Sequence, residues 1–253
     1  LTSNKGFSFV VNDTGYLEGV LNINNKVINQ EGMDVTKNYI DGANKALQIL
    51  KDNNIKIDGI VGVSAGVLFG VNYLSKQRGR VIRYNKKFSK DKRYMGIHSL
   101  LKTGNIINKE FSFYEVPFKL DIFDDETFKK SDTDFYATIT NVETGKPEYI
   151  KIKSVFDQME VLRVTSSMPF VSEIIELEGG KYLDGGISDS IPIEKCKELG
   201  YDKIIVVLTR PIDYRKKKSN KILTKIIFLL YKEDDKIYFI ITSEFDEFWD
   251  WLD

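Results

Sequence analysis

The pentapeptide Gly62-Val63-Ser64-Ala65-Gly66 sets the architecture of this chain. An apolar run at residues 57–63 leads into it, and a second apolar run at residues 67–74 follows. This order predicts a strand, a sharp turn and a helix, because glycines leave room where a strand turns at once into a helix. Such a turn leaves the serine hydroxyl open to a substrate. It also points the first N–H groups of the helix at whatever lies above the serine. Two interpretations stay open at this point: a nucleophilic serine, or an ordinary helix start capped by serine.

The segment before the pentapeptide favours an α/β fold. Phe7, Phe9 and Val11 alternate with polar residues, which predicts a strand, and we expect residues 20–23 to pair with it in a β-hairpin. Residues 35–52 predict a helix, since their apolar positions share one stripe. Strand, helix, strand and helix in succession are typical of a parallel sheet with helices on its faces.

The segment after residue 131 continues this pattern. Two strands are expected around a turn at residues 143–146, and a later buried strand is expected at the centre of the sheet because it is continuously apolar and β-branched. A helix beginning with a capping box of Ser154 and Asp157 is also expected. The predicted strands are 135–141, 148–152 and 204–208, and the predicted helices are 154–166 and 192–200.

We expect a single domain over residues 1–253, with two irregular parts. Residues 76–131 are rich in Lys, Arg, Phe and Tyr and have weak periodicity, which predicts an insertion of short helices and loops beside the site. Residues 212–253 form an atypical C-terminal region with a basic run and an apolar segment at 222–231. That segment is expected to pack on the core, and contact with a lipid surface is the alternative.

Composition excludes several classes of protein. Hydrophobic residues make up 42% of the 253 residues, which is ordinary for a globular protein. The formal net charge is zero, so the chain as a whole has no attraction to nucleic acid or to anionic lipid. The single cysteine, Cys196, excludes an internal disulfide and predicts a reducing, cytoplasmic compartment. No apolar run reaches the ~18 to 20 residues of a membrane-spanning helix.

A serine nucleophile needs a base, and the sequence offers a carboxylate more readily than an imidazole. The one histidine, His98, lies inside the insertion with no acid placed to orient it, so we expect a surface or packing role. Asp184 ends a short apolar run and is followed by Gly185 and Gly186, which let the backbone come close to the sheet. Asp184 is therefore the candidate base, and a simple Asp-Gly turn is the alternative.

Several motifs together resemble the bacterial branch of the patatin-like phospholipase family. They are the pentapeptide at 62–66, Asn141-Val142-Glu143-Thr144-Gly145, Ser166-Ser167-Met168-Pro169-Phe170, and residues 182–192 around Asp184-Gly185-Gly186. The resemblance covers roughly residues 55–211. It implies a three-layer α/β/α fold with a mainly parallel central sheet. It also implies acyl-ester hydrolysis, often of lipids, by a dyad in which Ser64 is the nucleophile and Asp184 the base, with no metal or organic cofactor.

The chain departs from the family in the loop that should form the oxyanion hole. The family has a glycine-rich loop with an arginine, and its counterpart here is Glu31-Gly32-Met33-Asp34-Val35-Thr36-Lys37, with one glycine of three. By the resemblance, the oxyanion donors are the backbone N–H groups of Gly32, Met33 and Asp34, together with that of Ala65. Losing one such donor raises the barrier by ~3 to 4 kcal/mol in known cases.

Two functional hypotheses follow. The first is a serine acyl hydrolase whose partner is a lipid or another acyl ester, with peripheral membrane contact as a further expectation and no nucleic acid. The second is a non-catalytic or weakened protein of the same fold that binds a lipid or a protein, and the altered loop at residues 31–37 motivates it. Labelling of Ser64 by a fluorophosphonate probe would separate them.

Overall fold

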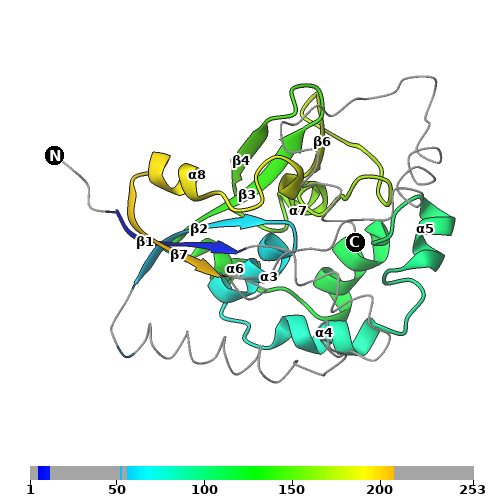
Figure 1. The fold of residues 1–253 in the computed structure, drawn as a ribbon. Coiled ribbons are helices and arrows are strands. Elements are labelled where there is room, and N and C mark those ends of the chain that lie inside the picture. Colours follow the sequence, from blue (N-terminus) through cyan, green and yellow to red (C-terminus); the bar gives the residue numbers. More distant parts are fainter. Residues whose placement is uncertain (1–4, 12–51, 53–55, 208–253) are drawn as a thin grey trace, which may run out of the picture.

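The computed structural model describes residues 5–11, 52 and 56–207 of the 253-residue chain. Figure 1 shows the order of elements along the chain. The strands are β1 Lys5–Val11, β2 Ile57–Val63, β3 Asp134–Asn141, β4 Pro147–Lys151, β5 Ile175–Leu177, β6 Gly180–Asp184 and β7 Tyr201–Val207. The helices are α3 Ala65–Leu74, α4 Arg80–Phe88, α5 Ile97–Thr103, the π-helix η1 Lys109–Leu120, α6 Asp125–Lys129, α7 Met159–Val164, the 3₁₀ turn η2 Gly185–Ile187 and α8 Ile193–Glu198.

All described strands belong to one mixed sheet with the order β5-β6-β3-β2-β1-β7, and β4 also pairs with β3. The pairs β3–β2, β2–β1 and β1–β7 are parallel, whereas β4, β5 and β6 add antiparallel pairs. Both edges of β1 are occupied, by β2 and by β7. The predicted hairpin between β1 and residues 20–23 is therefore wrong, because alternation identifies a strand but not its partner.

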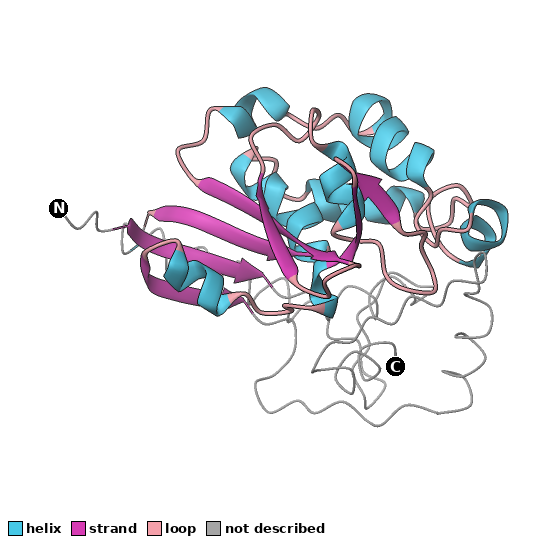
Figure 2. Cartoon of the chain, turned by 90° about the horizontal axis from the view of Figure 1, so that it is seen from above, coloured by secondary structure: helices cyan, strands magenta, loops and turns pink. Residues whose placement is uncertain are grey.

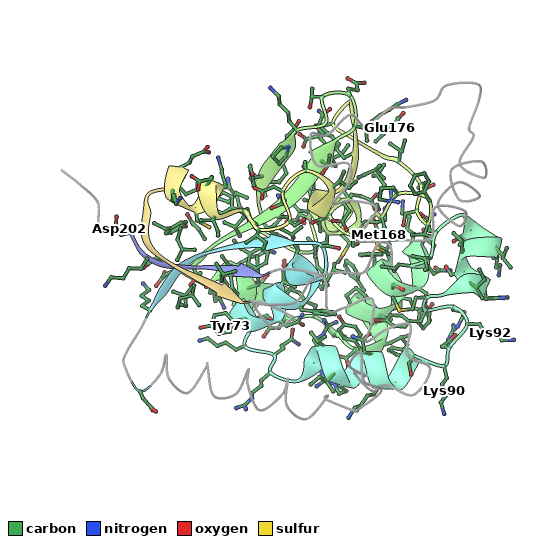
Figure 3. The ribbon with its side chains drawn as sticks, in the orientation of Figure 1. Tyr73, Lys90, Lys92, Met168, Glu176 and Asp202 are labelled. Carbon is green, nitrogen blue, oxygen red and sulfur yellow. The ribbon has the colours of Figure 1, made fainter. Side chains whose placement is uncertain are left out.

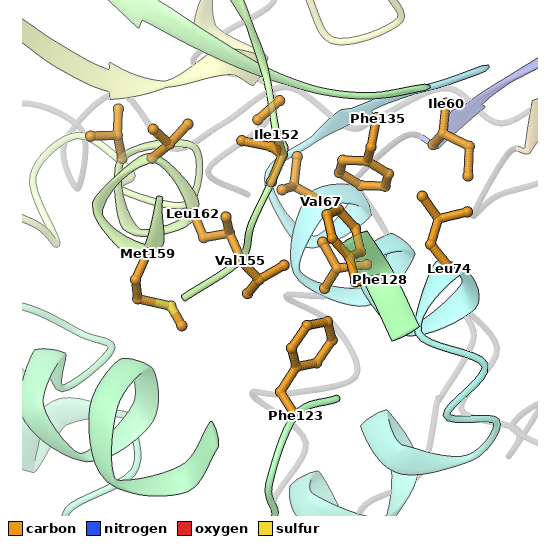
Figure 4. Close-up of a cluster of buried hydrophobic side chains, with 14 of the residues drawn as sticks. Ile60, Val67, Leu74, Phe123, Phe128, Phe135, Ile152, Val155, Met159 and Leu162 are labelled. Atoms are coloured by element: carbon orange, nitrogen blue, oxygen red, sulfur yellow. The ribbon is translucent and has the colours of Figure 1, made fainter. Parts of the chain in front are cut away.

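The apolar core lies on both faces of the sheet. On one face, α3 and α7 pack on Ile60 of β2 and Phe135 of β3, within a large cluster that includes Val67 and Leu162 (Figure 4). On the other face, Cys196 of α8 packs with Val61 and Tyr201. Figure 2 shows most described helices on one side of the sheet and α8 on the other. Ile60 and Val61 are consecutive and face opposite layers, as the period of a strand requires.

Two of the predicted elements differ from the structure. The predicted helix 154–166 is regular only in α7, and the hydroxyl of Ser154 accepts the N–H of Asp157 at 3.1 Å, as in a capping box. The reciprocal acceptor is Gln158, whose Oε1 accepts the N–H of Lys153 at 2.7 Å and that of Ser154 at 3.3 Å. The strand predicted at the centre is β7, which lies at the end of the sheet in the described part of the chain. A continuously apolar run indicates that both faces of a strand are covered by other elements. It does not show whether both edges of the strand are paired with other strands.

Of the other predicted elements, some are confirmed and some lie outside the described residues. The strands at 57–63, 135–141 and 148–152 are confirmed as β2, β3 and β4, and the helix after Pro192 is confirmed as α8. The predicted helix at 35–52, apart from residue 52, and the predicted elements at 212–253 lie outside the described residues. Single-domain organisation over residues 1–253 stays a prediction.

A buried carboxylate, Asp125, ties α6 to the segment that precedes α7. Its Oδ1 accepts the N–H of Val155 at 2.6 Å, its Oδ2 accepts the hydroxyl of Ser154 at 2.8 Å, and Lys129 lies 2.8 Å from Oδ2. Burial alone would raise the pKa of the Asp125 carboxyl, but the hydrogen bonds from Lys129, Ser154 and Val155 outweigh it and hold that pKa below its usual range. The charged form is therefore the one that the fold stabilises.

Replacing Asp125 with asparagine is expected to lower the free energy of unfolding by about 2 kcal/mol at neutral pH. Because the pKa is lower in the folded state, this contribution is present above the unfolded value and disappears as the pH falls through the folded value. Urea denaturation of both proteins at neutral and acid pH measures the difference. Asp157→Asn, at an exposed position nearby, is the matched control and should change little. A difference that stays constant down to acid pH would contradict the assignment.

Candidate active site

The register of β3 brings Ser64 and Asp184 together. Strand β2 runs parallel to β3 and ends with Val63 opposite Thr138. Strand β6 runs antiparallel along the same edge of β3 and ends with Asp184 opposite Ile139, the next residue. The carboxyl ends of β2 and β6 therefore face each other end to end, and both chains must turn away there. Ser64 is the first residue of one turn, and Asp184 is the last strand residue before the other.

Ser64 occupies a strained turn between β2 and α3. Its backbone has φ 51° and ψ −121°, a conformation that L-residues rarely adopt and that is typical of a serine on a sharp strand-to-helix turn. A Cβ on Gly62 would lie 3.0 Å from both the amide nitrogen and a methyl group of Val67. Glycine at position 62 therefore lets the first turn of α3 fold back against the strand.

Two threonines that sequence reasoning missed hold this turn in place. The N–H of Ser64 donates to Oγ1 of Thr165 at 3.0 Å, and that hydroxyl donates to the carbonyl of Thr138 at 2.6 Å. Both threonines are fully buried. Thr165, directly after α7, thus links the turn at Ser64 to β3. The only signal in the sequence is its position just before the Ser166–Phe170 motif.

Asp184 is 1% exposed and its backbone and carboxyl groups are engaged on several sides. Its N–H donates to the carbonyl of Ser167 at 2.9 Å, and its own carbonyl accepts the hydroxyl of Thr140 at 2.7 Å. Its Oδ1 accepts the N–H of Gly186 at 2.7 Å. A Cβ on Gly185 would lie 2.2 Å from the carbonyl oxygen of Thr138, so only glycine fits where η2 crosses β3.

The hydroxyl of Ser64 donates to Oδ2 of Asp184 at 2.5 Å. Ser64 is 4% exposed, so this hydrogen bond forms between two buried side chains. One carboxylate oxygen faces the serine and the other faces Gly186, which fixes the orientation of the carboxyl group. This is the geometry that a general base needs towards the proton it takes.

The second carboxylate of the same turn has a different environment. Oδ2 of Asp189 accepts the phenolic hydroxyl of Tyr149 at 2.5 Å. Burial raises the pKa of the Asp189 carboxyl, although the hydrogen bonds from Tyr149 and Ile191 oppose the shift. Burial, and then the nearby Asp189, raise the pKa of Tyr149. Asp184 is thus the acid of this turn that contacts the serine.

The structure describes some of the remaining predicted site residues and does not describe others. Ala65 is the first residue of α3 and is buried, and Gly66 follows it in the first turn. Gly32, Met33 and Asp34 lie outside the described residues. His98 is exposed on α5, in keeping with the surface role expected for it. No cluster of three His, Cys, Asp or Glu side chains suited to a metal ion occurs within residues 5–11, 52 and 56–207.

A family model described as Patatin-like phospholipase matches residues 42–196, which is more than half of the chain. The chain belongs to the patatin-like phospholipase family. Its α/β fold, with helices on both faces of a mixed sheet, agrees with this assignment. The family implies ester hydrolysis in general, and its name implies lipid substrates. The matched range includes both Ser64 and Asp184.

A curated relative of this patatin-like chain is "Uncharacterized protein YjjU" from Escherichia coli strain K12. The two sequences are 25% identical over 163 residues, which are 61% of this chain and 44% of the relative. The chain therefore spans less than half the length of the curated relative that it matches. None of the helices in the described ranges is long and apolar enough to cross a membrane.

Proposed function

We propose that this chain is a serine acyl-ester hydrolase that acts on a lipid, with Ser64 as nucleophile and Asp184 as general base. The observation that carries the proposal is the 2.5 Å hydrogen bond from the Ser64 hydroxyl to Asp184 at a strained strand-to-helix turn. A free serine hydroxyl is a weak nucleophile, and a contacting base activates it. The family match and the rigid support of both residues favour the same assignment.

In the proposed reaction, Ser64 Oγ attacks the carbonyl carbon of the ester while its proton passes to Oδ2 of Asp184. The tetrahedral intermediate collapses, the bond to the alcohol breaks, and the alcohol leaves with that proton. A water molecule then attacks the acyl-serine and gives a proton to Asp184, which returns it to Ser64 as the fatty acid leaves. The dyad alone balances the protons, and the reaction needs no metal or organic cofactor.

The charge that develops on the carbonyl oxygen needs hydrogen-bond donors. The start of α3 contributes the positive end of a ten-residue helix directly after Ser64, and Ala65 supplies its first N–H. The other proposed donors are Gly32, Met33 and Asp34. Their loop is the part of the proposal on which the alternative function, a weakened or non-catalytic lipid- or protein-binding module, depends.

A mostly apolar cavity lies near the strand-to-helix turn at Ser64; Arg80 and Ser112 also line it, whereas Ser64 and Asp184 do not. It has a volume of about 70 Å³ and lies between α3, the insertion and α7. Leu68, whose N–H donates to the carbonyl of Ser64 at 3.2 Å, lines it together with Phe113 and Leu162. Apolar walls one helical turn from the serine suit a hydrocarbon chain better than a polar group. A cytoplasmic location, with a peripheral contact to membrane, completes the proposal.

Labelling with a fluorophosphonate probe tests this function. The probe forms a covalent bond with a serine only when the hydroxyl is activated and an oxyanion hole is present. We expect one label on the full chain, located at Ser64 by mass spectrometry. Chain denatured before the addition of probe is the control and should stay unlabelled. A folded protein that takes no label would favour the binding module and overturn the hydrolase assignment.

A further inference from the structure

The charge of the chain is concentrated in one segment. Residues 76–120 contain twelve lysines and arginines against three acidic residues, although the formal net charge of the whole chain is zero. This segment comprises α4, α5 and η1, which lie beside the sheet (Figure 1). The rest of the chain is correspondingly acidic, and four acidic residues follow the segment directly at residues 121–126.

Ten of the twelve cations of this segment fall into two groups. Arg80 and Arg83 pair with Asp121, and Arg93 pairs with Asp91. Seven lysines, by contrast, are exposed and make no ion pair with any residue of the described ranges. They are Lys76, Lys86, Lys87, Lys90, Lys92, Lys102 and Lys119. Figure 3 shows Lys90 and Lys92 projecting outward from the molecule. The arginines hold the insertion together, and the lysines are available to an external anion.

Exposed apolar side chains occur in the same segment. Within the described residues, every large apolar side chain that is exposed lies between Tyr73 and Ile122. The most exposed are Leu101 at 81% and Ile97 at 69%, both on α5. They are four residues apart and therefore share one face of the helix, with His98 and Lys102 forming a parallel polar row. An isoleucine and a leucine this exposed on one helical face are candidates for burial against an apolar medium.

We propose that this side of the insertion, residues 90–102, docks the protein on a membrane that contains anionic lipid. Ile97 and Leu101 enter the boundary between headgroups and acyl chains, and Lys90, Lys92 and Lys102 meet the anionic headgroups. Lysine is depleted at protein–protein interfaces, which disfavours a protein partner. A nucleic acid would use the lysines but not the two aliphatic side chains, since single strands stack on aromatic residues.

The docking surface is connected to the candidate active site. The N–H of Gly96, which precedes α5, donates to the carbonyl of Ile106 at 2.8 Å, and the N–H of Ile106 donates to the carbonyl of Val171. Val171 belongs to the segment that begins at Ser167, whose carbonyl holds the N–H of Asp184. In Figure 1 the strands β1 and β7 point their carboxyl ends towards the side where α5 lies. Docking through α5 would therefore bring the lipid to the carboxyl end of the parallel strands, where Ser64 follows β2.

Sedimentation with lipid vesicles tests this proposal without any turnover. The full chain, in a Ser64→Ala background, is mixed with vesicles of phosphatidylcholine alone or of equimolar phosphatidylcholine and phosphatidylglycerol. We expect binding to the anionic vesicles and a fall in affinity as salt is raised, because salt screens exposed charges. Lys90→Glu with Lys92→Glu should weaken binding by about 25-fold or more, since each lysine near an anionic surface contributes roughly fivefold.

A charge reversal of two lysines at the opposite end of the strands is the control. Lys56 precedes β2 and Lys153 follows the antiparallel β4, so both lie at the amino end of β3, away from Ser64. Lys56→Glu with Lys153→Glu changes the net charge equally and should keep the parent affinity. Equal loss in both double variants would overturn the assigned surface. Thermal melts are expected to differ little among the variants, since the one ion pair lost, Lys56 with Asp132 at 3.9 Å, is exposed.

The apolar part of the proposal has its own test. Leu101→Ser leaves the charge unchanged and should weaken binding to anionic vesicles by about tenfold or more, because a buried leucine side chain is lost from the lipid. Full binding by Leu101→Ser would mean a purely electrostatic surface for some other polyanion and would overturn the lipid assignment. Equal affinity for the two vesicle compositions would do the same. The proposal does not depend on hydrolysis, so an unlabelled Ser64 would leave this result interpretable.

Discussion

Replacing Ser64 with alanine is expected to abolish ester hydrolysis while the fold survives. The hydroxyl is the proposed attacking atom, and its removal leaves Asp184 without a nucleophile to activate. Loss of the nucleophile in serine hydrolases lowers kcat by on the order of 10⁶-fold, because the remaining groups act only through it. Hydrolysis of p-nitrophenyl acyl esters measures turnover, and circular dichroism measures the fold.

Ser75→Ala is the matched control for this variant. Ser75 follows the last residue of α3 as Ser64 precedes the first, and it is equally buried. Its hydroxyl donates to Oε1 of Gln77 at 3.0 Å, so its loss should lower stability by about 1 kcal/mol and leave kcat near that of the parent. Turnover by Ser64→Ala at the parent rate would exclude Ser64 as nucleophile.

Replacing Asp184 with asparagine is expected to lower kcat by on the order of 10⁴-fold. The amide has the same shape and can still accept the N–H of Gly186, but it takes no proton from Ser64. A base and nucleophile that act as one unit give effects that do not add. The double variant of Ser64→Ala and Asp184→Asn should therefore be no slower than Ser64→Ala alone, measured with the same esters.

Asp189→Asn separates the role of the dyad from the presence of a second buried acid. Asp189 lies five residues after Asp184 and its carboxyl accepts the hydroxyl of Tyr149. Its amide variant should keep most of the turnover. If Asp189→Asn were as slow as Asp184→Asn, the base would have been misassigned between the two carboxylates.

The sequence marks Ser64 and Asp184 as candidate site residues because glycines lie beside each of them. The glycines at 62 and 185 are required by close approaches of backbone, to Val67 and to Thr138 respectively. Glycines required in this way can be recognised in the sequence before the fold is known. The residues alone made Asp184 the candidate base for Ser64, with a simple Asp-Gly turn as the alternative, and the resemblance to a family favoured the dyad.

Other parts of the fold could not be predicted, for physical reasons. Alternation reports which face of a strand is covered, and it carries no information about the neighbouring strand, so the partner of β1 was wrong. The hydroxyls of Thr165 and Thr140 act through long-range contacts to Ser64 and Asp184, and threonine in a buried strand or helix end has no distinctive spacing. The proposed docking surface depends on which apolar side chains are exposed. Only the structure shows that Ile97 and Leu101 are exposed.

Strands β2 and β6 meet end to end on one edge of β3. Their pairing with β3 therefore sets the distance between Ser64 and Asp184. A slip of one residue along β3 would move either strand by about 3.3 Å and turn its side chains to the opposite face. The hydroxyl and the carboxylate would then be out of reach of each other. The insertion at residues 76–131 has no such constraint, because it lies outside the strands and only joins α3 to the amino end of β3. The basic insertion, with its docking helix, can therefore be long, altered or exchanged between relatives while the separation of the two reacting groups stays fixed.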